Sequence, residues 1–506
     1  MKNINGNSFW RSSIQPLLIA IFSAFFLFSI NVGETCFSEF VTIVLVTTFS
    51  VLLLLKITYF FFRDYAKASI FLSAFLIFFF FLSPLLEYIK ENYGGQSFFR
   101  ARYFLILCFI FICWIFIKLK KSINKDKIVF LSKFLVFPFL FLIGFSIVKI
   151  GIGKYKIHNL VNEFQKENNV FWDEYLADIK QDPSDKELPN IYFIILDCYA
   201  SHDVMLNVYG YDNSEFLDKL KKRGFYIAEK CYSNYPSTFV SIPATLNMNY
   251  LNNDQWKDDG SIVIGLTNYM VKNNNAARFL KEKGYQYLLN PSHWGPTQTS
   301  PYSDFKLGSG LTEVFYRGLI RSTYVASFTS VFLDNTLLAP LYRRFQDYVI
   351  RKIVLRQFDM LKNTVNLKDP FFVFTHFVCP HGPYLFNEDG SPSKKRWYEE
   401  GIPTQAAFIS KKIYEVIDYI LEKSSKPPVI IIQADHALGS ADLNTAGILN
   451  AYYLPDKKLK KLLYPIISPI NNFRLILDYY LGSKLGLLKD DYFVWDQFKG
   501  FTKITS

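Results

Sequence analysis

The sequence has few cysteines, and their positions follow no regular pattern. Six occur among 506 residues, and two of them, Cys108 and Cys113, fall inside a long apolar run. The other four are too dispersed for a disulfide framework or a zinc ribbon, in which cysteines recur at short spacings. A bridge between Cys198 and Cys231 remains open for an oxidising compartment, with no support from their spacing.

The sequence also lacks a nucleic-acid recognition motif and any interleaving of aromatic with basic residues. Its formal net charge is nevertheless +12. Part of this excess lies in the loops between apolar runs, and a basic outer domain also suits an anionic lipid headgroup surface. We therefore expect no nucleic-acid partner. There is no internal repeat and no low-complexity segment apart from the apolar runs.

Long apolar runs dominate the first part of the chain. Phenylalanine occurs 52 times and the mean hydropathy is +0.12, so we expect a chain that is not wholly soluble and has more than one domain. Each run is near the ~20 residues that a bilayer core requires. No small-residue cleavage site follows the first run, which favours a retained helix over a signal peptide. The runs cover 13–33, 39–61, 69–89, 102–118 and 128–149.

Basic residues in the short loops predict the orientation of these spans. With a cytoplasmic N-terminus, Arg63, Lys67 and the basic cluster at 118–127 lie inside, whereas the first outer loop, GETCFSE, has only acidic charges. Five spans then place everything after about residue 150 outside. We predict a multi-pass protein of the cytoplasmic (inner) membrane with an extracytoplasmic domain. A span count that differs by one would reverse this orientation.

Changes in composition divide the chain into three parts. Residues 1–150 are the predicted transmembrane helical anchor, and residues 151–188 are an amphipathic helical connector. The segment PSDKELP breaks the helical pattern, so the extracytoplasmic domain is expected at 189–506.

Three apolar runs of the outer domain end in acidic or histidine side chains. Runs that are too apolar to alternate, and that are separated by helical patterns such as EFLDKLKKRG, are typical of buried parallel strands in an α/β sheet. Ligands bind beyond the carboxyl ends of such strands. One such acid or histidine is usually a helix cap or a packed residue, but three strand ends together indicate a site. The residues are Asp197 in 190–203, His376 and His381 in 371–384, and Asp435 and His436 in 427–440.

Two features of these segments point to metal-assisted chemistry. Asp435 and His436 offer a carboxylate oxygen and an imidazole to one ion, a pairing that suits Zn²⁺ or Mn²⁺. In SNYPSTFVSIPATLNMNYL a helix is expected to begin near Thr238. A hydroxyl at a helix N-terminus beside a cation is well placed for nucleophilic attack. The alternative is an ordinary N-cap, which is far commoner.

Taken together, four elements resemble the sulfatase-like branch of the alkaline phosphatase superfamily. They are Asp197 after the first strand, S-T-x-x-S-I-P at 237–243, H-G-P-Y at 381–384 and I-I-I-Q-A-D-H at 430–436. Within that branch, the five-span anchor is similar to those of lipid A phosphoethanolamine transferases and lipoteichoic acid synthases. The resemblance implies about five transmembrane helices followed by an α/β alkaline-phosphatase-like (sulfatase) domain with a central, mostly parallel sheet.

The resemblance also implies roles for individual residues. Thr238 would be the nucleophile as well as a metal ligand, because these transferases place Thr three residues before Ser-x-Pro; Ser237 is its main rival. His381 would contact the substrate phosphate or the leaving group, and His376 is the less certain substrate-binding residue, since it could serve packing. The implied ligands of the Zn or Mn ion are Asp197, Thr238, Asp435 and His436.

Two departures from the family pattern bear on function. There is no C/S-x-P-x-R element, because Cys231 is followed by Tyr-Ser-Asn, and sulfate-ester hydrolysis is therefore disfavoured. Ala437 stands where the family usually has Gly, so a methyl group there could shift His436 and leaves an inactive site open.

The resulting prediction is a membrane-embedded, metal-dependent transferase. It would move a phosphoryl-alcohol headgroup, of phosphoethanolamine or phosphoglycerol type, from a phospholipid donor to an envelope glycan or lipid acceptor through a phosphothreonine. Two alternatives remain: a phosphoester or sulfoester hydrolase of envelope glycans, and a non-enzymatic glycan-assembly protein. The segment PSHWGPTQTSPYSDF at 291–305 is either an aromatic sugar platform or a loop packed on its own aromatics.

Overall fold

The computed structural model separates the chain into two compact units. The helical unit comprises Met1–Lys156 and Val325–Gln346, and the α/β unit comprises Ile157–Tyr324 and Asp347–Ser506. The structure describes residues 14–93, 101–121, 125–179, 187–251, 260–304, 328–395, 397–437, 445–496 and 500–504.

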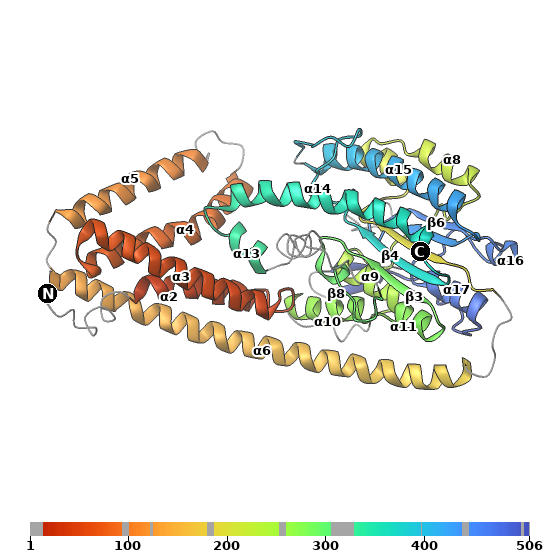
Figure 1. Cartoon of the computed structure of the whole chain (residues 1–506), viewed down its shortest axis with the longest axis horizontal. Coiled ribbons are helices and arrows are strands. Elements are labelled where there is room, and N and C mark those ends of the chain that lie inside the picture. Colours follow the sequence, from red (N-terminus) through yellow and green to blue (C-terminus); the bar gives the residue numbers. More distant parts are fainter. Residues whose placement is uncertain are drawn as a thin grey trace. The chain divides into compact units, whose positions relative to one another are not determined.

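Apolar helices form the helical unit (Figure 1). Within the described residues, three segments are long and apolar enough to cross a membrane, by length and composition: Phe37–Phe62, Tyr65–Leu86 and Phe130–Asn169. The number of five spans, and the orientation that depends on it, stay predictions. The helices are α2 (Gln15–Ile30), α3 (Phe37–Phe62), α4 (Tyr65–Tyr93), α5 (Ala101–Lys120), the first part of α6 (Lys125–Ile179), α13 (Phe328–Asp334) and the start of α14 (Ala339–Asn363).

Large aromatic side chains on these helices remain exposed. Phe49 is 70% exposed and Phe137 is 75% exposed. Leaving apolar surface in water costs about 25 cal/mol per Å², and contiguous surface of this kind is accommodated by lipid or by another protein. The exposed side chains therefore agree with a membrane anchor.

The helical unit includes a segment that the sequence had assigned to the outer domain. The ring of Phe328 in α13 lies 5.5 Å from Phe28 and 5.6 Å from Phe40, between ring centroids. Its backbone N–H also donates to Glu39 Oε2 at 2.9 Å. The helix α6 continues without a break from the fifth apolar run to Ile179, through most of the residues predicted as a helical connector. The boundaries predicted from composition stay predictions.

A six-stranded sheet is the centre of the α/β unit. Its strand order is β2-β6-β5-β1-β4-β3. The four strands β5, β1, β4 and β3 are parallel, and β6 and β2 are antiparallel at one edge. The predicted fold class, apolar helices followed by a mostly parallel α/β sheet, is therefore confirmed. The strands are β1 (Ile191–Leu196), β2 (Tyr226–Ile227), β3 (Gln286–Asn290), β4 (Phe371–Phe377), β5 (Val429–Gln433) and β6 (Asn450–Tyr453).

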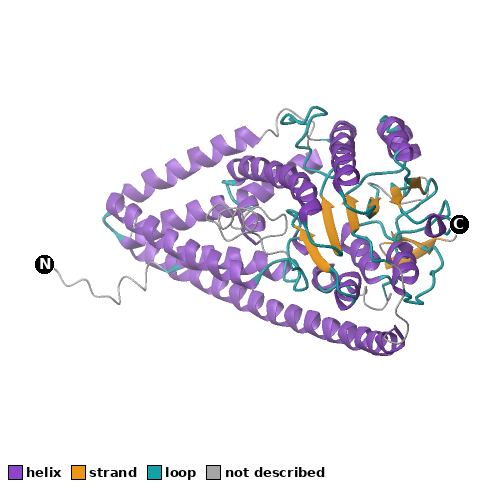
Figure 2. Cartoon of the chain, turned by 45° about the vertical axis from the view of Figure 1, so that its right-hand side comes forward, coloured by secondary structure: helices purple, strands orange, loops and turns teal. Residues whose placement is uncertain are grey.

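The central strands are apolar on both faces because helices cover both sides of the sheet. Every residue of β1, β4 and β5 is buried, which explains why their sequences do not alternate. Figure 2 shows the strands between helices. One group of helices comprises α7 (His202–Tyr209), α8 (Ser214–Lys222) and α15 (Tyr398–Lys423); the other comprises α9 (Thr238–Asn247), α10 (Gly260–Lys272), α11 (Asn275–Glu282) and α17 (Asn471–Leu481).

Smaller elements complete the unit. Trp172, in the C-terminal part of α6, is fully buried and donates from Nε1 to Asn275 Oδ1 at 2.8 Å, which attaches this part of the helix to α11. The remaining elements are η3 (Gly295–Thr297), η4 (Thr364–Asn366), α16 (Lys457–Lys460) and the antiparallel pair β7 (Tyr492–Asp496) and β8 (Gly500–Ile504).

Candidate metal centre

The carboxyl ends of three adjacent parallel strands gather the predicted site residues. Asp197 directly follows β1, and His376 is the penultimate residue of β4 rather than a residue beyond it. Asp435 lies two residues after β5. Ile195 of β1 pairs with His376 on one side and with Gln433 on the other, so strand register alone brings these three side chains to one edge of the sheet.

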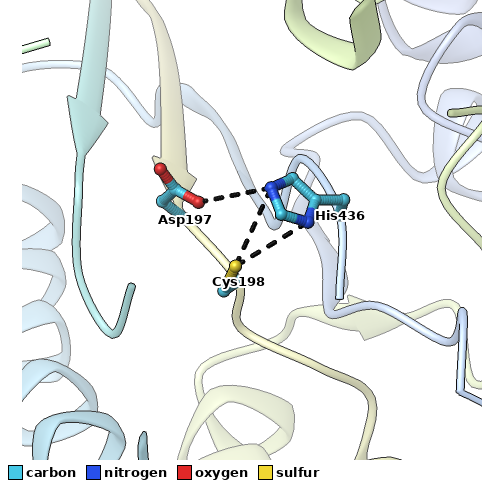
Figure 3. A group of neighbouring side chains, drawn as sticks. All are labelled: Asp197, Cys198 and His436. Atoms are coloured by element: carbon cyan, nitrogen blue, oxygen red, sulfur yellow. Dashed lines mark hydrogen bonds and ion pairs between the residues drawn. The ribbon is translucent and has the colours of Figure 1, made fainter. Parts of the chain in front are cut away.

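The four residues predicted to bind metal lie around one imidazole nitrogen. His436 Nε2 is 3.7 Å from Asp197 Oδ1 and 3.6 Å from Asp435 Oδ2. It is 3.1 Å from Thr238 Oγ1. We call Asp197, Thr238, Asp435 and His436 the carboxylate cluster; Figure 3 shows two of its members.

Two carboxylate oxygens of this cluster lack a hydrogen-bond partner in the described part of the chain. Asp197 Oδ1 and Asp435 Oδ2 are buried and make no hydrogen bond among the residues that the structure describes. The side chains are only 3% and 0% exposed. Unpaired buried carboxylate oxygens are costly, and a divalent cation between them removes that cost. Three oxygens and one imidazole form a donor set that suits Zn²⁺ or Mn²⁺.

The electrostatics of the two acids also favour a cation. Burial raises the pKa of Asp435, and the neighbouring charge of Asp197 raises it further. Burial alone would raise the pKa of Asp197 as well, but the charge of His381 and then the contact with His376 lower it below its usual value. Two acids that repel each other in a buried site gain from a positive ion between them.

A backbone carbonyl orients the metal-facing histidine. His436 Nδ1 lies 3.1 Å from the carbonyl oxygen of Ala437, and we assign the Nδ1 proton to this bond, which leaves the Nε2 lone pair for a metal. Ala437 is buried. It is not among the described non-glycine residues whose φ is positive. The methyl group at this position therefore requires no left-handed backbone.

The start of α9 places the Thr238 hydroxyl beside the cluster. Ser237 is the N-cap, with an extended backbone, and its side chain makes no capping hydrogen bond. The first N–H groups of a helix have no intrahelical partner and favour an anion. Ser233 and Ser241 both donate their hydroxyl hydrogens to the carbonyl oxygen of Asp435. These two bonds hold the loop after β5 against α9.

His376 faces Asp197 from the neighbouring strand. Its Nε2 lies 3.3 Å from Asp197 Oδ2, and its Nδ1 lies 3.1 Å from Thr297 Oγ1. Its ring meets Trp294 edge to face at 5.3 Å between centroids. The segment 291–304 therefore packs against the site with Trp294 buried, and His376 belongs to the site through Asp197.

His381 lies in the loop that follows β4. Its backbone N–H donates to the carbonyl oxygen of Asp197 at 3.1 Å, and its ring is 6.5 Å from that of His436 between centroids. Burial would lower the pKa of His381, but the charge of Asp197, the Gly382 carbonyl and the charge of Asp435 together raise it above its usual value. These neighbours favour the protonated form of the imidazole.

Sequence reasoning missed a fourth histidine, which lies beside the site. His293 is 0% exposed, and neither of its ring nitrogens has a hydrogen-bond partner in the described part of the chain. Burial lowers its pKa to about 3, and the charges of His376 and His381 contribute in the same direction. His293 stands three residues after β3, so the strand-end signal was available once QYLLN is read as a strand. We call His293, His376 and His381 the imidazole cluster.

Sequence reasoning also missed Cys198, the neighbour of Asp197. Its Sγ lies 3.7 Å and 3.8 Å from the two ring nitrogens of His436 (Figure 3), and its backbone N–H donates to Asp435 Oδ1 at 3.3 Å. Its φ of 64° is left-handed, a conformation that costs a non-glycine residue about 1–3 kcal/mol. Burial raises the pKa of the thiol well above its usual value.

A parallel sheet with acids and a histidine at its strand ends, beside a threonine that begins a helix, agrees with the superfamily that the motifs indicated. A model of the sulfatase family matches residues 189–496. The chain belongs to the sulfatase family, which confirms the family resemblance inferred from the motifs. No curated protein matches the chain.

Solved structures with a similar fold come from several bacteria. The C-terminal periplasmic domain of phosphoethanolamine transferase EptC from Campylobacter jejuni is 14% identical with a TM-score of 0.37, covering 58% of this chain and 90% of that one. The corresponding domain of EptC from Escherichia coli is 12% identical with a TM-score of 0.37, covering 64% and 94%. The lipoteichoic acid synthase LtaP from Listeria monocytogenes is 12% identical with a TM-score of 0.36, covering 64% and 84%.

Proposed function

We propose that this protein is a membrane-anchored, metal-dependent transferase of phosphoryl-alcohol headgroups. One observation carries the proposal: the Thr238 hydroxyl, at the start of α9, lies 3.1 Å from His436 Nε2, beside two buried carboxylate oxygens that have no described partner. A nucleophile next to an electron-rich, cation-seeking site is the arrangement that a phosphodiester reaction needs.

Asp197, Thr238, Asp435 and His436 would hold the metal ion. When bound, the ion supplies positive charge that lowers the pKa of the Thr238 hydroxyl and stabilises the reacting phosphate. In the first displacement, Thr238 Oγ1 attacks the phosphorus of a phospholipid, and its proton passes to solvent. The bond between phosphorus and the diacylglycerol oxygen breaks, and that oxygen takes a proton from His381. The free N–H groups of α9 stabilise the charge on the phosphate.

In the second displacement, a hydroxyl of an envelope glycan or lipid attacks the phosphothreonine. Its proton returns to His381, and Thr238 leaves with a proton from solvent. Two steps suit a lipid donor and a bulky acceptor that do not fit the site together. The apolar helices keep the site near its donor, and the basic inner loops favour an extracytoplasmic position at the inner membrane.

Hydrolysis of a phosphate or sulfate ester is the second candidate, and membership of the sulfatase family favours it. With water as the second nucleophile, the same residues would release the free alcohol. The absence of a C/S-x-P-x-R element in the full sequence favours a phosphate ester over a sulfate ester.

Mass spectrometry of the full-length protein in detergent tests the proposal. After incubation with phosphatidylethanolamine or phosphatidylglycerol and Zn²⁺, we expect a headgroup-phosphate adduct on the peptide that contains Thr238. The adduct should be absent with a chelator and in Thr238→Ala, and present in the control Ser237→Ala. Continued lipid turnover by Thr238→Ala would contradict the proposal. Added lipid A or glycan then separates the candidates, because transfer yields a modified acceptor and hydrolysis only a free alcohol.

A further inference from the structure

Cys198 is a buried thiol that points into the metal centre. Consecutive residues of an extended strand point to opposite faces, so the residue after Asp197 would normally turn away from the site. The left-handed backbone at Cys198, with φ of 64°, instead brings both side chains toward the His436 ring (Figure 3). Glycine adopts this conformation without strain, yet the chain has a side chain with a donor atom here.

The donor atoms around Cys198 are grouped closely enough to serve one ion. Donor atoms at about 2.0–2.3 Å from a tetrahedral Zn²⁺ stand about 3.3–3.6 Å from one another. The Cys198 Sγ lies 3.7 Å from His436 Nδ1 and 3.8 Å from Nε2, and Nε2 lies 3.7 Å from Asp197 Oδ1, so these separations are slightly longer than those of bound ligands. The sulfur, the Asp197 oxygen and a His436 nitrogen all lie within 4.8 Å of one another.

A second, independent observation shows that this place is built for a ligand. Asp197 Oδ1 and Asp435 Oδ2 are buried, face the same imidazole nitrogen and have no hydrogen-bond partner among the described residues. Cys198 is itself free of a disulfide and 0% exposed. Its backbone N–H donates to Asp435 Oδ1. Cys198 therefore orients the carboxylate of Asp435 and also offers its sulfur as a metal ligand.

We propose that Cys198 is a ligand of the metal ion, bound through its thiolate together with Asp197 and His436. As the sulfur–metal bond forms, the thiol proton leaves to solvent. Thiolate favours soft and borderline ions such as Zn²⁺, whereas carboxylate oxygens suit Mg²⁺, Ca²⁺ and Mn²⁺. Cys198 thereby makes the site selective for Zn²⁺, and for Cd²⁺ as a probe, over Mn²⁺. The inference rests on the proposed function, because both require an ion in the carboxylate cluster.

Cobalt spectroscopy of the full-length protein in detergent tests this assignment directly. Co²⁺ added to the metal-free protein should give its visible ligand-field bands and a near-ultraviolet sulfur-to-cobalt charge-transfer band. In Cys198→Ser the charge-transfer band should disappear while the visible bands remain. The control Cys231→Ser, which alters another buried free thiol of the same unit, should retain both. Zinc affinity should fall about 10–100-fold in Cys198→Ala, with manganese affinity little changed.

The outcomes separate the two proposals. Visible bands without a charge-transfer band in the wild type overturn the thiolate ligand and leave the proposed function intact. A charge-transfer band that persists in Cys198→Ser also overturns it. If wild-type protein binds neither Co²⁺ nor Zn²⁺, the metal centre itself fails, and both proposals fall together. The wild-type spectrum decides the matter even if a variant does not fold.

Discussion

The two clusters at the strand ends differ in what they lack. Among the described residues, the carboxylate cluster has buried oxygens without a hydrogen-bond donor, whereas the imidazole cluster has buried nitrogens without a hydrogen-bond partner, including both of those on His293. The first therefore favours a cation, and the second offers N–H groups to an anion. A divalent ion would neutralise the carboxylate cluster, and the negative oxygens of a phosphodiester beside it would accept hydrogen bonds from the imidazole cluster. The two sides of the site therefore suit ligands of opposite charge. Substitutions in the carboxylate cluster should chiefly change metal affinity, and substitutions in the imidazole cluster should chiefly change activity.

The largest effect is expected from Asp435→Asn in the carboxylate cluster. Loss of this charge should lower zinc affinity at least about a hundredfold. The free energy of unfolding of the metal-free protein should rise, because repulsion between Asp197 and Asp435 is removed. Metal titration and denaturant unfolding measure these quantities, with the exposed acid variant Asp212→Asn as control. Unchanged metal binding would show that the two acids do not share an ion.

His381→Gln should separate catalysis from metal binding. Without an imidazole to protonate the leaving oxygen, we expect headgroup release to fall about 10²–10³-fold, while zinc affinity stays near that of the wild type. Kinetics and metal analysis on the same sample provide the comparison. If metal content falls in step with activity, His381 belongs with the carboxylate cluster and the division between the clusters is wrong.

His293→Leu should raise the stability of the protein and lower its activity. Replacing an imidazole that is buried without a hydrogen-bond partner among the described residues by an apolar side chain should raise the free energy of unfolding by about 1 kcal/mol, and removing its polar nitrogens from beside the site should lower activity about tenfold. Denaturant unfolding and lipid turnover measure the two effects. A less stable protein with full activity would make His293 a packing residue only.

The smallest effect is expected from Ser241→Ala. Outer residues that orient metal ligands typically contribute about 10–100-fold to affinity. Here the loss should be only a few-fold, because Ser233 still donates to the same carbonyl of Asp435. The double variant Ser233→Ala/Ser241→Ala should lose more than the product of the single losses. If the loss of metal affinity in the double variant equals the product of the two single losses, the hydroxyls act independently.

Local sequence signals predicted the sheet and named candidate residues on both sides of the site. Asp197 and Asp435 follow fully buried strands, whose apolar runs mark their own ends, and the start of α9 at Thr238 was expected from its flanking residues. The register between β1, β4 and β5 then brings the ends of these strands together. The mostly parallel sheet followed from the same runs, but the two-residue strand β2 at its antiparallel edge is too short to leave a pattern.

The features that were missed depend on tertiary structure. The inward direction of Cys198 comes from one left-handed φ, which no periodicity encodes. His293 was hidden in a segment that stood out for its aromatic residues, and its burial depends on packing against other strand ends. The return of Phe328 to the helical unit rests on aromatic contacts between residues distant in sequence.

The two carboxylate oxygens of Asp197 face different histidines. Oδ1 lies 3.7 Å from His436 Nε2, and Oδ2 lies 3.3 Å from His376 Nε2. Whatever draws electron density toward one oxygen weakens the other as a donor. Binding of an anion at the imidazole cluster and binding of a metal ion at the carboxylate cluster should consequently be linked. Thermodynamic reciprocity makes the change in affinity equal in both directions. An inhibitor aimed at the histidines would then alter how firmly the ion is retained, and exchanging the ion would change the inhibitor's affinity by the same factor.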